Sequence, residues 1–177
     1  MQIASQEDPS CKIWMQIWKS KIHERHKIMW WQILMDALPC KAKVARFLHM
    51  ANSKCTLCNH EEKNTLHFLW SCPVSARLWF LYCWGITAER VRISSWKEWF
   101  QVLGNDSNRP PTSSFNDLMQ RAATIVSVIW RERNSIAHGA PVVPFDILCG
   151  LVGRPIQEWD ASVELDQNRR WSNPTLG

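Results

Sequence analysis

Residues 55–73, CTLCNHEEKNTLHFLWSCP, carry four side chains of the kinds that bind zinc. Their order is Cys-x-x-Cys, eight residues, a histidine, four residues and a third cysteine. Thiolate and imidazole suit Zn²⁺, and a Cys-x-x-Cys turn supplies two ligands from one short stretch of chain. The spacing therefore predicts one zinc ion, held by Cys55, Cys58, His67 and Cys72.

The residues around these ligands favour the same geometry. Asn59 follows the second cysteine, where the turn needs a residue that tolerates a positive φ angle. Residues 61–70 suit a short helix that presents His67, and Pro73 forces Cys72 out of helical geometry so that it can turn back toward the metal. Because the two ligand pairs are a short loop apart, the entropy cost of closing the site is small.

Two ligand assignments have alternatives. His60 competes with His67 for the third position, although it lies where the chain is still turning away. Cys83 could replace Cys72, but it falls within the apolar run LWFLYCW and is typical of a small core residue. The other cysteines have no partner at ligand spacing and are interpreted as inert thiols: Cys11, Cys40 and Cys149.

The predicted metal is structural. Three sulfurs and one imidazole complete a tetrahedron, whereas a catalytic zinc keeps one coordination position for water. The sequence also lacks a phosphate-binding glycine loop, a nucleophile elbow and a paired-carboxylate motif. We therefore expect no enzymatic activity and no small-molecule substrate.

Apolar periodicity predicts a mainly α fold: a small helical domain with a CCHC zinc knuckle, followed by a long C-terminal helix and a weakly ordered tail. Ser114 and Asp117 resemble a capping box at the start of that long helix. The expected helices of the first domain cover 12–20, 26–38, 41–51, 76–84 and 94–104. The expected organisation is a flexible N-terminus at 1–11, the zinc-binding domain at 12–104 with its knuckle at 55–73, a linker at 105–114, an amphipathic helix at 115–139 and a poorly ordered tail at 140–177.

Charge and composition indicate where such a chain works. The first 54 residues carry nine Lys and Arg against four Asp and Glu, and so account for the net charge of +5. No stretch approaches the length and apolarity of a membrane span, and the N-terminus lacks the pattern of a signal peptide. Seven irregularly spaced cysteines argue against a disulfide framework. We expect no membrane partner and an intracellular location, in the nucleus or cytoplasm.

The segments IWKSKIHERHKIMWWQILMDALPCKAKV and CTLCNHEEKNTLHFLWSCPVSARLW resemble the zinc-binding domain of reverse transcriptases from plant LINE-type, non-LTR retrotransposons, over about residues 13–84. The four predicted ligands match the family's metal positions one by one. Two later segments also resemble parts of these polyproteins. One is VIWRERNSIAHG at 128–139, which resembles a helix that often follows the zinc-binding domain. The other is RRWSNPTLG at 169–177, which resembles the lead-in to a ribonuclease H domain.

The departures from that family pattern leave the ligands intact. Thr56 replaces a usual proline and Asn59 a usual glycine, while Tyr82 is followed by Cys-Trp and not by a polymerase's aspartates. The resemblance implies a non-catalytic zinc module of a retrotransposon polyprotein, whose partner could be a polymerase domain.

Two functions from different classes follow. In the first, the module binds RNA or DNA as an accessory to reverse transcription. Its contacts would come from seven basic residues: Lys19, Lys21, Arg25, Lys27, Lys41, Lys43 and Arg46. In the second, it is a structural adaptor stapled by zinc, or a degenerate fragment without activity.

The twelve tryptophans favour a packed core over base stacking. Trp31 and Trp70 are the two that we expect to be partly exposed. The expected core tryptophans are Trp14, Trp18, Trp30, Trp79, Trp96, Trp99 and Trp130.

Overall fold

The computed structural model describes residues 9–39, 54–60 and 64–172. Those ranges are mainly α-helical and contain no β-strand, as predicted. The helices are α1 (Pro9–Lys19), α2 (Glu24–Leu34), α4 (Pro73–Tyr82), α5 (Trp96–Leu103), α6 (Phe115–Ala137) and α7 (Phe145–Ser172), with a π-helical turn η1 (His67–Ser71) and a 3₁₀ turn η2 (Asp106–Asn108). The helix predicted at 41–51 lies outside the described residues.

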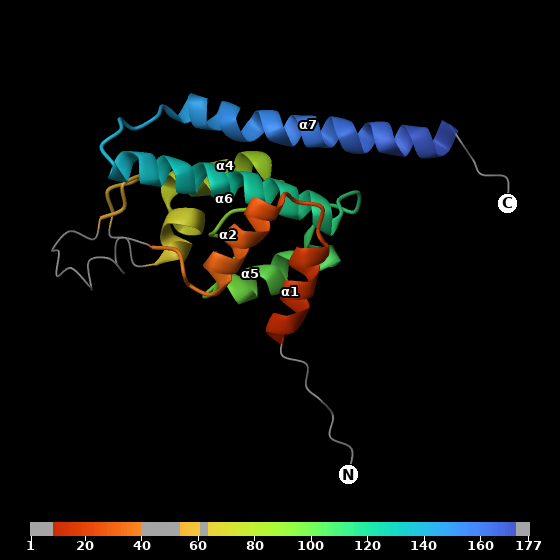
Figure 1. The fold of residues 1–177 in the computed structure, drawn as a ribbon, viewed down its shortest axis with the longest axis horizontal. Coiled ribbons are helices and arrows are strands. Elements are labelled where there is room, and N and C mark those ends of the chain that lie inside the picture. Colours follow the sequence, from red (N-terminus) through yellow and green to blue (C-terminus); the bar gives the residue numbers. More distant parts are fainter. Residues whose placement is uncertain (1–8, 40–53, 61–63, 173–177) are drawn as a thin grey trace, which may run out of the picture.

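Helix α6 is the central element of the fold. It pairs lengthwise with α7, and α2, α4 and η1 pack against it (Figure 1). Its Ser114 cap accepts a hydrogen bond from the Asp117 amide while the Asp117 carboxylate accepts one from the Ser114 amide, so the predicted capping box is present. Such reciprocal capping satisfies two amides that the first turn would otherwise leave unpaired. No helix among the described residues is long and apolar enough to cross a membrane.

A cluster of aromatic rings fills the space between α2, α4 and α5. Trp99 is fully buried at its centre, and its ring stacks on Trp30 with 5.4 Å between centroids. The rings of Trp70, Trp79 and Trp96 also contact Trp99, at centroid distances of 5.7 to 6.4 Å. Aromatic pairs at these separations attract one another beyond the area they bury. The cluster therefore joins α2, the turn η1, α4 and α5 into one core.

Two of the tryptophan predictions are wrong. Trp18 is 49% exposed, because α1 points Ile13 and Ile17 inward and leaves the next position outside. Trp70 is only 3% exposed, because η1 directs it edge-on against Trp79, with 5.0 Å between the rings.

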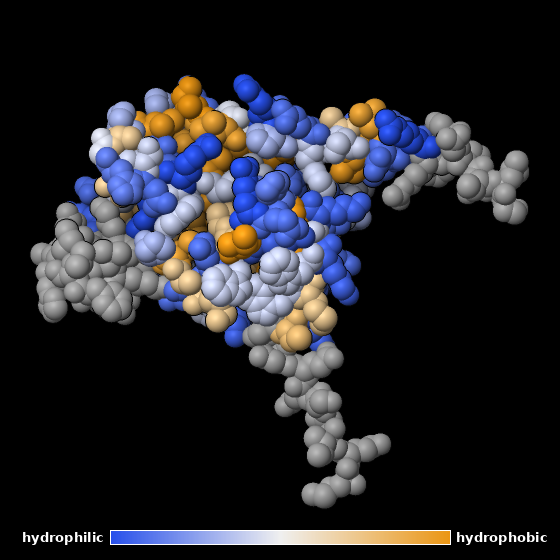
Figure 2. All heavy atoms as spheres, in the orientation of Figure 1, coloured by the Kyte–Doolittle hydropathy of each residue, from blue (hydrophilic) through white to orange (hydrophobic). Residues whose placement is uncertain are grey.

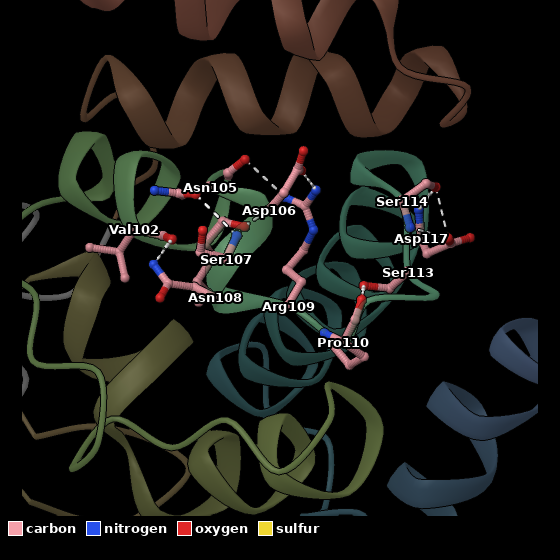
Figure 3. Close-up of polar contacts among 12 residues, drawn as sticks. Val102, Asn105, Asp106, Ser107, Asn108, Arg109, Pro110, Ser113, Ser114 and Asp117 are labelled. Carbon is pink, nitrogen blue, oxygen red and sulfur yellow. Dashed lines mark hydrogen bonds and ion pairs between the residues drawn. The ribbon is translucent and has the colours of Figure 1, made fainter.

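Residues 105–114, predicted to be a linker, connect α5 to α6, and the buried residues of these two helices belong to one core. Arg109 anchors this segment: its side chain is buried and donates hydrogen bonds of 2.9 Å to the carbonyls of Leu103 and Gly104, at the end of α5 (Figure 3). The same guanidinium pairs with Asp106 in η2. The other residues of the segment are exposed or half-buried, as suits a surface connection that is rich in turn formers.

We expect Arg109→Ala to make residues 105–114 susceptible to proteolysis while the wild-type segment resists. Loss of charged hydrogen bonds worth roughly 1.5–3 kcal/mol should raise the population of the locally open segment about tenfold or more. Digestion by subtilisin followed by mass spectrometry measures the cleavage rate, with exposed Arg90→Ala as the control. Equally rapid cleavage of the wild-type protein would contradict the anchoring role.

The tail predicted to be poorly ordered at 140–177 instead contains the 28-residue helix α7. Leu148, Val152 and Ile156 recur every four residues and are buried against the core. Gly150, Gly153 and Pro155 weakened the helical pattern in the sequence. Tertiary contacts offset that weakness.

Three of these contacts are polar. The guanidinium of Arg121 binds both carboxylate oxygens of Asp160 at 2.7 Å, and the Trp159 indole donates to Asp117 at 2.8 Å. The Tyr82 hydroxyl donates to the Cys149 carbonyl at 2.9 Å. A Cβ at Gly153 would approach the Tyr82 ring to 3.1 Å, so the glycine permits this close packing.

Candidate metal centre

The structure brings together the four residues predicted to bind zinc. One ligand atom from each of Cys55, Cys58, His67 and Cys72 lies within 4.8 Å of the others. Cys55 and Cys72 are buried, whereas the other two are half-buried at the edge of the protein. The Cys58 sulfur and the His67 Nε2 atom are 3.4 Å apart.

The first ligand pair is held by a tight turn. The Asn59 amide donates to the Cys55 carbonyl at 2.8 Å, and Asn59 has φ +61°. This is the left-handed conformation expected there, which asparagine tolerates better than most residues. The Cys55 amide in turn donates to the His60 carbonyl at 2.7 Å, so the backbone closes the turn from both ends.

The second pair is held by the π-turn η1, where a short α-helix had been expected to present His67. The Cys72 amide donates to the His67 carbonyl at 2.6 Å, five residues back. Cys72 then has extended backbone (φ −58°, ψ 134°) and Pro73 begins α4, as the sequence predicted for a residue before proline. Asn64 accepts a hydrogen bond from the His67 amide at 3.0 Å and so fixes the start of the turn.

Residues between these two ligands lie in the core, so the site is attached to the rest of the fold. Phe68, Leu69 and Trp70 are all 3% exposed or less. The Ser75 hydroxyl donates to the Phe68 carbonyl at 2.5 Å, and the Trp79 indole to the Leu69 carbonyl at 2.7 Å. Sequence reasoning missed Ser75 and Asn64, because a lone serine or asparagine gives no signal of the carbonyl or amide it will reach.

Backbone amides are directed at the sulfurs. Hydrogen bonds from the Cys72 thiol and from the Leu57 and Cys58 amides lower the pKa of Cys55 to about 4, although burial acts in the opposite direction. Burial raises the pKa of Cys58, while a hydrogen bond from the His60 amide acts to lower it.

The hydrogen bond to Cys55 and burial raise the pKa of Cys72, while the Val74 and Ser75 amides at the start of α4 lower it. Amides aimed at each of the three sulfurs are an arrangement that stabilises thiolates. The donor set, three sulfurs and one imidazole, fits a tetrahedral zinc ion and fills its coordination.

The alternative ligands lie elsewhere. His60 is exposed, and its backbone amide and carbonyl take part in the turn while its ring lies outside the cluster. Cys83 is fully buried in the core, and burial raises the pKa of its thiol to about 12, in keeping with an inert role. Cys11 is exposed and Cys149 half-buried, both outside the cluster, while Cys40 lies outside the described residues.

The comparisons with known proteins bear on the same segment. Residues 2–79 match the family model described as zinc-binding in reverse transcriptase. The match contains all four ligands and reaches into α4. No curated protein and no solved structure matches the chain. The match describes a zinc-binding segment, and the Cys₃His cluster within it is able to hold one zinc ion.

The basic residues predicted to contact nucleic acid differ in their solvent exposure. Lys19, Lys21 and Arg25 are exposed where α1 ends and α2 begins. Lys27 is only 7% exposed, and its ammonium group donates to the Trp18 carbonyl at 3.1 Å and to Glu24 at 2.9 Å. A nucleic-acid contact by Lys27, as the sequence predicted, would require its ammonium group to leave these internal partners. Three further candidates lie outside the described residues: Lys41, Lys43 and Arg46.

Proposed function

We propose that the zinc-binding domain is a non-catalytic module that binds RNA or DNA as an accessory to reverse transcription. The observation that carries the proposal is the exposed basic edge formed by Lys19, Lys21 and Arg25. All three lie within seven consecutive residues, and none of their side chains forms an ion pair with the described residues. Unpaired surface cations attract phosphates without first breaking an internal contact.

The backbone beneath these side chains is held in place. The Lys21 amide donates to the Asn116 side chain at 2.9 Å, which ties the connection between α1 and α2 to the start of α6. The Ser20 hydroxyl donates to the Ile17 carbonyl at 2.6 Å and satisfies the last turn of α1. A preorganised edge of this kind loses little entropy when a ligand binds.

In this proposal the zinc ion has a structural role and stabilises the fold of the module. Its four protein ligands leave no coordination position for water, which zinc hydrolases require. The resemblance to non-LTR retrotransposon enzymes supports an origin in a polyprotein of that kind. A nucleic-acid accessory would work in the nucleus or cytoplasm.

A second candidate is an adaptor that packs against a polymerase domain. Ile28 and Trp31 lie on α2 and Met35 is its C-cap residue, at positions i, i+3 and i+7, and all three are 45% to 58% exposed. Residues at this spacing share one face of a helix, so they form an apolar stripe suited to a protein partner. Protein binding through such a stripe depends weakly on salt.

Salt dependence distinguishes the two candidates. We expect labelled RNA and DNA oligonucleotides to bind at low salt, with log K falling linearly as log salt rises, at a slope of about −0.9 per phosphate contact for duplex DNA. Fluorescence anisotropy at several salt concentrations measures the slope. An absence of binding at 20 mM salt would overturn the proposal and leave the adaptor or an inactive fragment.

A matched pair of variants locates the contact. Lys19→Gln with Lys21→Gln should weaken binding and flatten the slope by roughly 1.8 for duplex DNA, because two phosphate contacts are lost. Arg90→Gln with Arg169→Gln removes the same charge from exposed positions elsewhere and should leave the slope unchanged. An equal effect of both pairs would mean that only net charge matters.

A further inference from the structure

A cavity of about 590 Å³ lies between the first turn of α2, the middle of α6 and the first half of α7. This is within the range of about 300–1,000 Å³ typical of ligand sites in proteins. Most of its wall comes from α6 and α7, beyond the segment that matches the zinc-binding family. It is therefore a separate feature from the metal centre.

Positive charge dominates this cavity. Arg25 contributes from α2, Arg131 from α6 and Arg154 from α7, and Asp146 is the one acidic residue among those that line it. The three arginines are exposed, and their side chains form no ion pair or hydrogen bond with the described residues. Guanidinium groups present a planar fork of donors that matches the oxygens of a phosphate.

His26 adds a polar group that the protein does not satisfy. Its ring lines the cavity and is only 8% exposed, yet neither nitrogen has a hydrogen-bond partner among the described residues. Burial, followed by the charges of Arg25 and His23, lowers its pKa to about 4. The ring is therefore neutral at pH 7 and offers one donor and one acceptor.

Part of the cavity lining is apolar. Ile147 and Leu151, one turn apart on α7, are 51% and 40% exposed and line the cavity together with Val128. On the face drawn in Figure 2, hydrophobic residues gather over the first half of α7, with hydrophilic residues beside them. A ligand that contacts both the arginines and these apolar side chains carries an anionic group and a flat apolar surface.

We propose that this cavity binds an unpaired nucleotide of a single-stranded RNA or DNA, with its phosphate on the arginines and its base against Ile147 and Leu151. The inference rests on the proposed nucleic-acid function and extends it. Arg25 belongs both to the basic edge and to the cavity, so one strand can follow the two without interruption. A duplex is too wide for a cavity of this volume, whereas an unstacked base exposes the face that apolar side chains cover.

The test uses the full-length, zinc-loaded chain and labelled oligo(dT) and oligo(U). Arg131→Gln with Arg154→Gln should weaken single-strand binding about tenfold and flatten the salt slope by roughly 1.4, which is two contacts at 0.7 each. The control is Arg90→Gln with Arg169→Gln, which removes the same charge outside the cavity. Leu151→Ser should weaken single-strand binding and leave duplex binding unchanged. Zinc content and circular dichroism establish that each variant is folded.

Each outcome separates the two proposals. If the wild-type chain binds no oligonucleotide, the proposed function fails. If Lys19→Gln with Lys21→Gln weakens binding but the Arg131 and Arg154 variant equals its control, the function stands and the cavity proposal is overturned. Loss of polyglutamate binding by that variant, with oligonucleotide binding unchanged, would assign the cavity to an acidic peptide and also overturn it.

Discussion

His67→Ala or Cys72→Ser will abolish zinc binding and destabilise the whole first half of the protein. Structural zinc contributes on the order of 10 kcal/mol or more to small modules, comparable to the entire stability of a domain. The two ligands enclose Phe68, Leu69 and Trp70, which are buried in the core. Loss of the metal therefore releases core side chains together with the knuckle.

Metal analysis and thermal unfolding measure this effect. One zinc per chain is expected for the wild type and nearly none for either variant, with a large fall in unfolding temperature. His60→Ala is the matched control, because this histidine is exposed and lies outside the cluster, and it should keep its zinc. Full zinc content after His67→Ala, or its loss after His60→Ala, would contradict the ligand assignment.

Trp99→Ala should cost about 3–5 kcal/mol, the second largest effect expected from a single substitution. The ring is fully buried and contacts four other tryptophans and Phe100, with 5.0 Å between the Trp99 and Phe100 centroids. Its removal leaves a cavity that rings packed from several elements cannot easily fill. Because Trp70 belongs to this cluster, zinc affinity should fall as well.

Urea unfolding at saturating zinc gives the change in unfolding free energy. Trp31→Ala is the control, since this ring is 45% exposed and its loss should cost under about 1 kcal/mol. Similar losses for both variants would show that the aromatic cluster does not carry the stability assigned to it.

The ligand set could be predicted because its geometry is local. Cys-x-x-Cys closes within one turn, Asn59 supplies the positive φ, and Pro73 ends the preceding turn wherever the rest of the chain lies. The choice of His67 over His60 followed from the same local argument. The π-turn that joins His67 to Cys72 could not be predicted, because it depends on Phe68, Leu69 and Trp70 all reaching the core.

Solvent exposure was predicted less well than helicity. Periodicity identifies a helix and its apolar face, but a wide apolar face does not reveal which ring is covered by a neighbour. For this reason Trp18 was predicted to be buried but is exposed, and Trp70 was predicted to be partly exposed but is buried. Lys27 was expected to be a surface cation, but in the fold its ammonium group donates a hydrogen bond to the Trp18 carbonyl.

The sequence by itself determined the metal ligands, the capping box and the helical character of the chain, since each depends on residues fewer than about twenty positions apart. Only the tertiary structure decided that α7 forms, because α6 supplies the ion pair and apolar surface that compensate for Gly150, Gly153 and Pro155. It also decided that Arg25 lines one cavity with Arg131 and Arg154, which lie more than a hundred residues further along the chain. Contacts between distant segments depend on how whole helices pack, and no local pattern records that packing.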